Sequence, residues 1–365
     1  MEISNNHYCV IMAGGIGARF WPMSKTSRPK QFIDILGIGK TLLQMTFDRL
    51  KKICPENQIY IVTNGIYRDQ VLEQLPTIDA SQVLCEPARR NTAPCIAYAN
   101  HVIQEKNPDA TIIVAPSDHI ILNEEVFLRN VLDSMKVAAR HDWLITLGIE
   151  PSRPDTGYGY IQFKEDTILK DLPKLKKVKT FTEKPNVELA ETFLASGDFL
   201  WNSGIFIWSL KSINQSFDQH LPEVNELFKE GKGKFGTAEE SDFIKQTYSL
   251  CRNISIDYGI MEKATNVYVM SVDFGWSDLG TWGSLYDIRN KDENNNAVVG
   301  SNVITYDSKG CIVNMPNDKL VVLQGLTDFI VVEEDNALLV CRKDDEQQIR
   351  QFVNDIKVEK GDKYV

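Results

Sequence analysis

A glycine-rich turn near the N-terminus carries residues that are suited to bind a polyphosphate. Gly14, Gly15 and Gly17 follow an apolar strand pattern at 8–12, and glycines let backbone N–H groups approach an anion without a Cβ atom in the way. The segment from Gly14 to Lys30 has no acidic residue, although the whole chain has a formal net charge of −10. Its basic residues are Arg19, Lys25, Arg28 and Lys30. The turn therefore predicts a site for the phosphates of a nucleotide.

Two common phosphate-binding motifs do not match this turn. A dinucleotide fingerprint would need a third glycine at Phe20, and a phosphate loop ending at 39–41 would need its first glycine at Asp34. We interpret 39–41 as a turn followed by a helix cap. A tight turn with solvated basic residues is the structural alternative for 14–30, and the motifs further along the chain decide against it.

Two aspartates far apart in the sequence are suited to hold a divalent cation. Asp118 follows an apolar strand pattern at 111–115, and Asp278 lies in the turn 275–282 between two tryptophans. Mg²⁺ prefers one or two carboxylates together with phosphate oxygens, so the pair predicts a magnesium site beside the glycine turn. A turn or helix-cap role is the alternative for Asp118, and we interpret His119 as structural.

A second set of residues is suited to recognise a sugar phosphate. The Glu183 carboxylate accepts hydroxyl hydrogens, and the Lys184 ammonium next to it neutralises a phosphate. Asn202 precedes a buried strand pattern and offers both a donor and an acceptor. Gly157 lies in a turn where a ligand could contact the backbone. A surface ion pair between Glu183 and Lys184 is the alternative, and such a pair contributes little to stability.

The elements that must position these residues alternate between strand and helix patterns over the first 150 residues. Strand patterns occur at 8–12, 58–63, 83–86, 111–115 and 144–149, and helix patterns at 42–52, capped by Thr41, and from Pro94 to about 106. This alternation predicts an α/β fold with a mixed, mostly parallel sheet and helices on both faces. Ligands of such sheets bind beyond the carboxyl ends of the strands. The glycine turn, Glu86 and Asp118 all fall at such ends.

The rest of the chain is less regular and ends in a β-rich segment. Between 151 and 285 we expect strands at 204–208 and 267–272 and helices at 187–195 and 257–264. A polar segment begins at Asp292. The short β patterns after it are at 298–303, 320–323, 329–332 and 337–341, and an amphipathic helix begins at about 344. We therefore predict a catalytic domain at 1–288 and a C-terminal β-rich extension at 289–365.

Composition limits the partners and the compartment of the protein. A net charge of −10 argues against a general surface for nucleic acid or anionic membrane. The seven cysteines are dispersed without a CxxC pair, and no apolar run approaches the length of a membrane span. The N-terminus lacks the pattern of a signal peptide, so we expect a cytoplasmic protein with free thiols. The β edges of the C-terminal extension could form a homodimer.

Taken together, the motifs resemble those of the bacterial mannose-1-phosphate guanylyltransferases, also called GDP-mannose pyrophosphorylases. The matching pieces appear in the expected order from residue 8 to about 285. They are GGIGARFWPMSK with RPKQF, EPARRNTAP, APSDH, GIEPSRPDTGYGYI, FTEKP, WNSGIF, SIDYGIMEK and GWSDLGTW. Two of them, EPARRNTAP and the SIDY segment, separate this group from the wider sugar nucleotidyltransferases.

The resemblance implies a nucleotidyltransferase fold with a β-helix-like C-terminal extension. It implies the reaction of GTP with mannose 1-phosphate to give GDP-mannose and pyrophosphate, with Mg²⁺ as cofactor. By motif, the implied roles are triphosphate binding by Gly14, Gly15, Gly17 and Arg19, approach to the α-phosphate by Lys30, and magnesium binding by Asp118 and Asp278. The remaining implied roles are mannose binding by Gly157, Glu183 and Asn202, binding of its phosphate by Lys184, and a place beside guanine for Glu86 and Asn91.

The chain departs from the family pattern at two places in the glycine turn. Ala18 stands where a threonine is frequent, and Lys25 replaces a frequent arginine; neither change removes a group that the reaction needs. Some members carry a fused isomerase domain, and we expect the guanylyltransferase activity alone, with Arg19, Lys30 and Asp118 as catalytic residues. The alternatives are a nucleotidyltransferase for another base or sugar 1-phosphate, and a non-catalytic regulator that binds sugar nucleotides.

Overall fold

The chain divides into two compact units. The computed structural model describes residues 3–166 and 168–365. The first unit contains the described residues up to Gly14 together with Thr46–Ser117 and Ile121–Trp276. The second contains Gly15–Met45, Asp118–Ile120 and Ser277–Val365. The domain boundary expected at 288 stays a prediction, because these units are divided differently along the chain.

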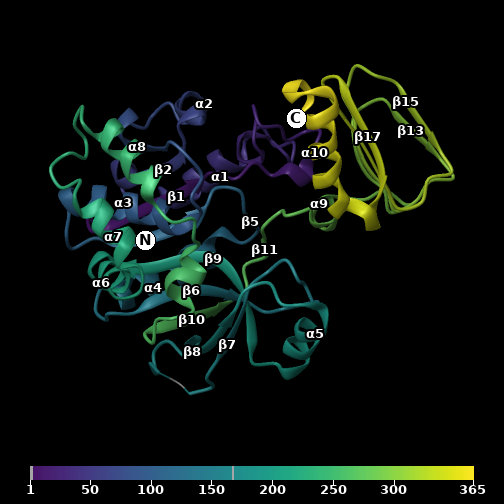
Figure 1. The fold of residues 1–365 in the computed structure, drawn as a ribbon. Coiled ribbons are helices and arrows are strands. Elements are labelled where there is room, and N and C mark those ends of the chain that lie inside the picture. Colours follow the sequence, from purple (N-terminus) through teal and green to yellow (C-terminus); the bar gives the residue numbers. More distant parts are fainter. Residues whose placement is uncertain (1–2, 167) are drawn as a thin grey trace. The chain divides into compact units, whose positions relative to one another are not determined.

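A nine-stranded mixed sheet forms the centre of the first unit, in the order β3-β2-β1-β4-β9-β6-β10-β8-β7 (Figure 1). Its strands are β1 (His7–Ala13), β2 (Ile59–Asn64), β3 (Val83–Glu86), β4 (Thr111–Pro116), β6 (Leu144–Ile149), β7 (Tyr160–Phe163), β8 (Leu175–Thr182), β9 (Phe199–Ser209) and β10 (Val267–Val272). The five strands expected before residue 150 are confirmed as β1, β2, β3, β4 and β6. The expected strand at 204–208 is confirmed as part of β9, and the one at 267–272 as the whole of β10.

Parallel pairing aligns the strand ends that precede the predicted site residues. β1 pairs in parallel with β2 and with β4, so that Cys9 lies opposite both Ile59 and Ile113. Val10 and Ile11 are fully buried, as expected for a strand covered on both faces. The carboxyl ends of β1, β2 and β4 therefore meet at one edge of the sheet.

Helices cover both faces of this sheet. The helices up to residue 250 are α1 (Leu42–Leu50), α2 (Arg68–Gln74), α3 (Thr92–Lys106), α4 (Glu124–Ala138), α5 (Val187–Ser196), α6 (Leu210–His220), α7 (Pro222–Lys229) and α8 (Glu240–Leu250). Tyr8 and Val10 share a core with α3, so the alternating buried residues Cys9 and Ile11 face the opposite layer. There α4 packs against β4, β6, β9 and β10. The elements α2, α4, α6, α7, α8, β7 and β8 were not predicted from the sequence.

The predicted helix cap at Thr41 and the predicted helix at 257–264 can be compared with the structure. The Thr41 cap is confirmed, because its hydroxyl accepts a hydrogen bond from the Gln44 backbone while the Gln44 side chain accepts one from the Thr41 backbone. The helix expected at 257–264 is confirmed only in part, because the helical residues are Asp257–Met261 and they form a π-helical turn. Such turns occur frequently at functional sites.

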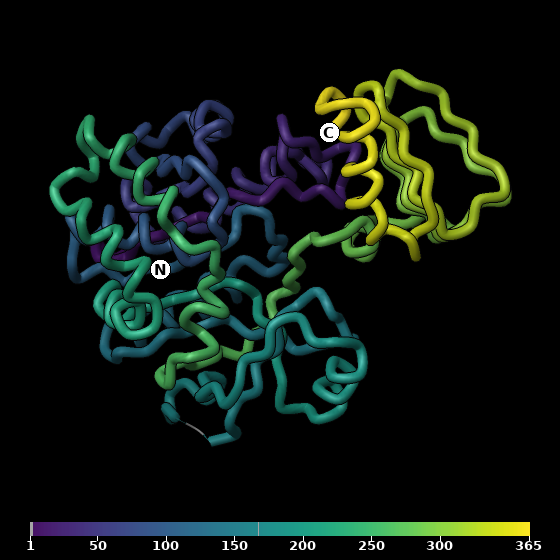
Figure 2. The backbone as a smooth tube through the Cα atoms, in the orientation of Figure 1, coloured from purple at the N-terminus to yellow at the C-terminus, as the bar shows by residue number. Residues whose placement is uncertain are grey.

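The second unit contains successive coils of a parallel β-helix. Its strands are β12 (Ala297–Val299), β13 (Val303–Tyr306), β14 (Ile312–Asn314), β15 (Val321–Gln324), β16 (Phe329–Glu334) and β17 (Ala337–Arg342). β12, β14 and β16 pair in parallel, β13 pairs in parallel with β15, and β17 closes the larger sheet in antiparallel pairing. Figure 2 follows the backbone through these coils. The expected C-terminal β-rich extension with its terminal helix is confirmed.

The helical elements of the second unit attach the glycine turn to the β-helix. They are η1 (Ala18–Phe20), η2 (Lys30–Phe32), α9 (Trp282–Ile288), η7 (Lys343–Gln348) and α10 (Ile349–Lys360), while the short strands β5 (Ile120–Ile121) and β11 (Trp276–Ser277) span the points at which the chain passes between units. Phe20, Trp21, Trp282, Ile330 and Ile349 share one apolar core. Figure 1 shows α10 running beside β17. The turn that carries Arg19 therefore packs on the β-helix.

We predict that Ile349→Ala lowers the stability of this unit by about 3 kcal/mol, because it leaves a cavity in that core. Ile349 is fully buried, whereas Val358 on the same helix is 86 % exposed. The control Val358→Ala should stay within about 0.5 kcal/mol of the wild type. Urea unfolding followed by tryptophan fluorescence measures both variants. Equal losses of stability in the two variants would contradict the shared core.

Candidate active site

The glycine turn has a backbone that needs glycine at one position and leaves space at another. Gly17 has a positive φ of 71°, and a Cβ atom there would lie 2.5 Å from Cβ of Lys30. At Gly15, by contrast, no described atom lies within 4 Å of the place where a Cβ would be. The turn is therefore closed against Lys30 on one side and open for a ligand on the other.

Lys30 lies at the centre of the predicted phosphate and metal residues. Its side-chain ammonium contacts Oδ2 of Asp118 at 2.8 Å, and it donates to the backbone oxygens of Asp278 at 2.8 Å and Leu279 at 2.9 Å. The residue is 3 % exposed, and an ammonium has three N–H donors. The structure thus brings together Lys30, Asp118 and the Asp278 turn, all within the second unit.

The two aspartates provide oxygen ligands only. The side chain of Asp118 is 28 % exposed; burial would raise its pKa, but Lys30 and His119 outweigh burial and hold the pKa below its usual value. The Asp278 carboxylate accepts a hydrogen bond from the Gly280 backbone at 2.9 Å. The described residues include no group of three or more His, Cys, Asp or Glu that could hold a metal. Two carboxylates completed by ligand oxygens fit Mg²⁺, which keeps water or phosphate in its other positions.

Arg19 lies against the same turn. Its Nη1 donates to the backbone oxygen of Gly280 at 3.4 Å, and its Nε donates to Oε1 of Gln347 at 2.9 Å. The turn 278–280 therefore contacts both predicted phosphate-binding cations through backbone oxygens. Because a carbonyl carries no net charge, these backbone contacts do not neutralise either cation.

In the first unit, both the oxygen and the nitrogen of the Asn202 side-chain amide, which was predicted to bind the sugar, make hydrogen bonds. Its oxygen accepts from the Thr146 hydroxyl at 3.1 Å and from the Gly204 backbone at 3.2 Å, while its nitrogen donates to Oδ1 of Asp257 at 2.9 Å. Asn202 thereby orients the Asp257 carboxylate. No role was predicted for Asp257 from the sequence, although it lies in the SIDY segment of the family motifs.

The predicted pair Glu183 and Lys184 lies in the same unit. The Lys184 ammonium contacts Oε1 of Glu183 at 2.6 Å, and Lys184 is much more exposed than Glu183. A Cβ atom on Gly159 would clash with Oε2 of Glu183, so Gly159 is the glycine that packs on this carboxylate. The predicted Gly157 is exposed, and its backbone N–H donates to Asp155 at 2.8 Å.

The pKa of the Asp257 carboxyl group depends on its burial and on a neighbouring carboxylate. Burial raises the pKa of Asp257 to about 6, and the neighbouring Glu183 carboxylate adds to this effect. A carboxyl group with this pKa is partly protonated near neutral pH, so that it can donate as well as accept a hydrogen bond. The arrangement of Asn202, Asp257, Glu183 and Lys184 suits a ligand with several hydroxyl groups and a phosphate.

The two residues expected beside a base have different surroundings. Glu86 ends β3 and is 6 % exposed, and the Tyr248 hydroxyl donates to its Oε1 at 2.9 Å. A Cβ atom on Gly14 would lie 3.7 Å from its Oε2. Burial raises the pKa of Glu86 to about 7. Asn91 is exposed and accepts from the Thr92 backbone at the start of α3.

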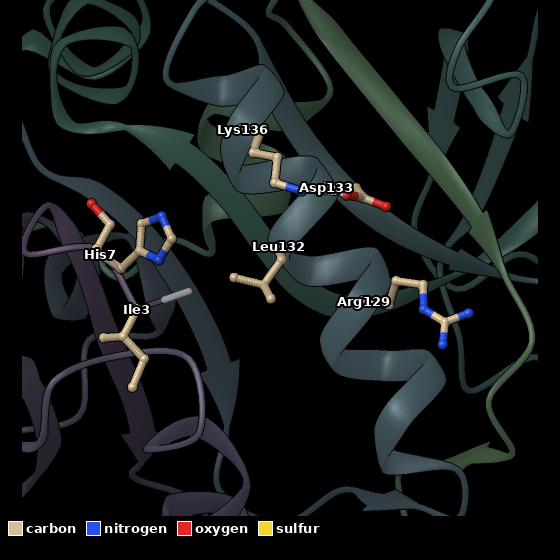
Figure 3. Close-up of a pocket in the computed structure, with 7 residues that line it drawn as sticks. Ile3, His7, Arg129, Leu132, Asp133 and Lys136 are labelled. Carbon is tan, nitrogen blue, oxygen red and sulfur yellow. Dashed lines mark hydrogen bonds and ion pairs between the residues drawn. The ribbon is translucent and has the colours of Figure 1, made fainter. Parts of the chain in front are cut away.

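A separate hollow of about 700 Å³ lies at the amino end of β1 (Figure 3). Figure 3 shows Arg129 and Lys136 on α4 opposite His7. Lys136 is paired with Asp133 at 3.0 Å, and burial lowers the pKa of His7, which favours its neutral form. Its described lining includes none of the predicted site residues. The predicted site residues therefore lie outside this hollow.

Glu86→Gln should remove a pH-dependent part of the stability. The folded chain holds the Glu86 proton up to a pKa of about 7, compared with an ordinary value of 4.5. Between these two values the unfolded chain releases this proton while the folded chain keeps it, so raising the pH should destabilise the wild type by up to about 3 kcal/mol.

Glutamine does not ionise, so the stability of this variant should change less over the same range. Urea unfolding at about pH 5 and about pH 8 measures the difference. The exposed Glu73 on α2 offers a control, because Glu73→Gln should keep the wild-type pH dependence. The same pH dependence in Glu86→Gln and the wild type would contradict the buried, raised-pKa carboxyl.

The fold of the chain agrees with what comparisons with known proteins found. Residues 8–295 match the model of the nucleotidyl transferase family, and residues 301–356 match that of the MannoseP isomerase/GMP-like β-helix domain. The chain is also similar to a crystal structure from Thermus thermophilus described as a mannose-1-phosphate geranyltransferase. The TM-score is 0.84 at 29 % identity, covering 96 % of this chain and 99 % of that one.

Curated relatives align over nearly the whole chain. A mannose-1-phosphate guanylyltransferase from Salmonella montevideo is 35 % identical over 98 % of this chain and 75 % of its own length. The alginate biosynthesis protein AlgA from Pseudomonas aeruginosa is 35 % identical over 95 % of this chain and 71 % of its own length. The chain therefore belongs to the nucleotidyl transferase family, within the group of mannose-1-phosphate guanylyltransferases.

Proposed function

We propose that the protein transfers GMP from GTP to α-D-mannose 1-phosphate and releases GDP-mannose and pyrophosphate. The observation that carries this proposal is the arrangement around Lys30, where an ammonium contacts Asp118 and the Asp278 turn, and Arg19 contacts the same turn. Cations held beside an open glycine turn suit a triphosphate, and the adjacent carboxylates suit its metal ion. The hydroxyl-binding residues of the first unit suit the sugar phosphate.

The reaction needs positioned charge more than a base. The attacking oxygen belongs to the phosphate of the sugar phosphate and is already anionic at neutral pH, so no group has to remove a proton. We infer that Lys30 neutralises the α-phosphate under attack, that Arg19 holds the remaining phosphates, and that Lys184 holds the attacking phosphate. Such contacts are worth most when they are in place before the charge develops.

Members of the nucleotidyl transferase family generally use a divalent metal ion, and we propose Mg²⁺ for this chain. Asp118 and Asp278 would hold it, and it would supply charge neutralisation at the phosphate oxygens. The Lys30 ammonium contacts the Asp118 carboxylate at 2.8 Å. Lys30 would therefore leave this carboxylate when it binds the phosphate. The backbone oxygens of Asp278 and Leu279 would keep the Lys30 ammonium near the metal site after that exchange.

Selection of the base and of the sugar would depend on buried carboxyl groups. Guanine offers N–H donors on its pairing edge, and the Glu86 carboxylate at the end of β3 would accept them, with Asn91 on the same segment. In the sugar site, Asp257 and Glu183 would bind hydroxyl groups of mannose. Asn202 would act there by orienting Asp257, and Gly157 would offer its exposed backbone.

We further propose a homodimer formed through the β-helix. Ile304 and Tyr306 of β13 and Val322 of β15 are between 44 % and 56 % exposed, and Ile304 lies opposite Val322 in the parallel pair. Exposed apolar side chains on adjoining strands suit burial against a second copy. A mass of one chain by light scattering would dismiss the dimer.

A cytoplasmic location belongs to the same proposal. The seven cysteines are all free thiols in the described chain, as suits a reducing compartment. Among the described residues, no helix has both the length and the apolar character that a membrane crossing requires.

The direct test is a matrix of nucleotides and sugar 1-phosphates. Purified protein with Mg²⁺ should release pyrophosphate fastest from GTP with mannose 1-phosphate, and more slowly when ATP, UTP or dTTP replaces GTP or glucose 1-phosphate replaces the sugar. A non-guanine nucleotide as the best substrate would overturn the proposed specificity. Binding of GDP-mannose without turnover of any pair would favour a regulator instead.

Asp118→Asn should fold normally and lose most activity. The substitution removes one of the two carboxylates proposed for the metal, and loss of one such electrostatic contact costs roughly a hundred-fold or more in turnover. Asp133→Asn is the control, because Asp133 also pairs with a lysine but lies on α4 beside the hollow. Near wild-type turnover in Asp118→Asn would refute the metal assignment.

A further inference from the structure

The side chain that holds Arg19 comes from the C-terminal end of the β-helix. Gln347 lies in η7, directly after β17, and its Oε1 accepts the Nε–H of Arg19 at 2.9 Å. Arg19 itself lies in η1, a turn of only three residues that follows the left-handed Gly17. So short a turn cannot fix a long and flexible side chain by itself, and an arginine has many rotamers to restrict.

From this contact we propose that Gln347 is a positioning residue, which holds the Arg19 guanidinium in the orientation that binds the triphosphate. This inference rests on the proposed function. Gln347 does not touch the reacting atoms and acts only through Arg19. The β-helix domain would thereby take part in nucleotide binding.

The chemistry of the acceptor supports this role. An amide oxygen orients the guanidinium without cancelling its charge, whereas a carboxylate in the same place would form an ion pair and compete with the phosphates. The preceding residue, Glu346, has such a carboxylate, but it accepts from the Gly283 backbone at 2.8 Å. The acid is therefore engaged at the start of α9, and the neutral Gln347 side chain contacts Arg19.

The element that carries Gln347 is firmly held against the arginine turn. Ile349, two residues further on, is fully buried in the core that also contains Phe20 and Trp21. The Trp21 indole donates to the backbone oxygen of Tyr364 at 2.7 Å. Both partners of the Arg19–Gln347 hydrogen bond are thus anchored on one apolar core, so their separation is set by packing.

A second contact ties the other end of the same segment to the β-helix. The Lys25 ammonium pairs with Oδ2 of Asp335 at 2.7 Å, at the turn between β16 and β17. Asp335 is 70 % exposed, so this pair contributes little stability. Together with the Trp21 contact, it holds the segment after Phe20 at two points and limits how far the neighbouring Arg19 can move.

The test is a double-mutant cycle between Arg19 and Gln347, measured as kcat/KM for GTP. Gln347→Ala should lower this value by about fivefold, which is the size of one net hydrogen bond, mostly through a higher KM. In an Arg19→Ala background the same change should have almost no effect, because the group that Gln347 orients is gone. Gln347→Glu should raise KM for GTP more than Gln347→Ala does, because it adds a competing charge.

Gln348→Ala is the matched control, since Gln348 lies in the same turn but donates to Asp345 at 2.8 Å; it should keep the wild-type value. An unchanged KM in Gln347→Ala would overturn the positioning role. An equal loss in both Arg19 backgrounds, or a lowered melting temperature that accounts for the loss, would make Gln347 structural. Each of these outcomes leaves wild-type GDP-mannose synthesis intact, whereas a wild-type protein without that activity would refute the proposed function itself.

Discussion

The buried ammonium of Lys30 is the constraint on which the candidate site depends. A charged group that is 3 % exposed is costly unless its donors are satisfied, and here the partners come from Asp118 and from the turn at Asp278 and Leu279. The hydrogen bonds and the ion pair of the Lys30 ammonium therefore bring together segments that are far apart in the sequence. The same side chain requires glycine at position 17, because its methylene groups occupy the space that a Cβ would need.

The site combines cations with acceptors that mostly carry no charge. Backbone oxygens of Asp278, Leu279 and Gly280 and the Gln347 amide contact Lys30 and Arg19, and the Asp118 carboxylate pairs with Lys30. In a chain with a net charge of −10, this arrangement would suit the phosphates proposed as ligands. An exchange of Asp118 from Lys30 to a metal ion would then release the ammonium at the moment when the nucleotide arrives.

Much of the fold was predictable because apolar runs bounded by turn residues mark the central strands, and the motifs identified Lys30, Asp118 and Asp278 by residue type. Other parts carry no such local signal. Asp257 lies in a π-helical turn whose pattern resembles an ordinary helix, and its raised pKa depends on burial and on the distant Glu183. Gln347 is one polar residue in a polar turn, and its contact with Arg19 joins positions 328 residues apart. Spacing along the chain contains no information about such a pair.

A crystal structure of the protein with GTP and Mg²⁺ would test the central claim most directly. The account predicts that Lys30 Nζ has left Asp118 for an oxygen of the α-phosphate, that Arg19 contacts the triphosphate while it stays bound to Gln347, and that the metal lies on Asp118 and Asp278. A triphosphate bound elsewhere, such as in the hollow beside His7 and Arg129, with Lys30 still paired with Asp118, would contradict it.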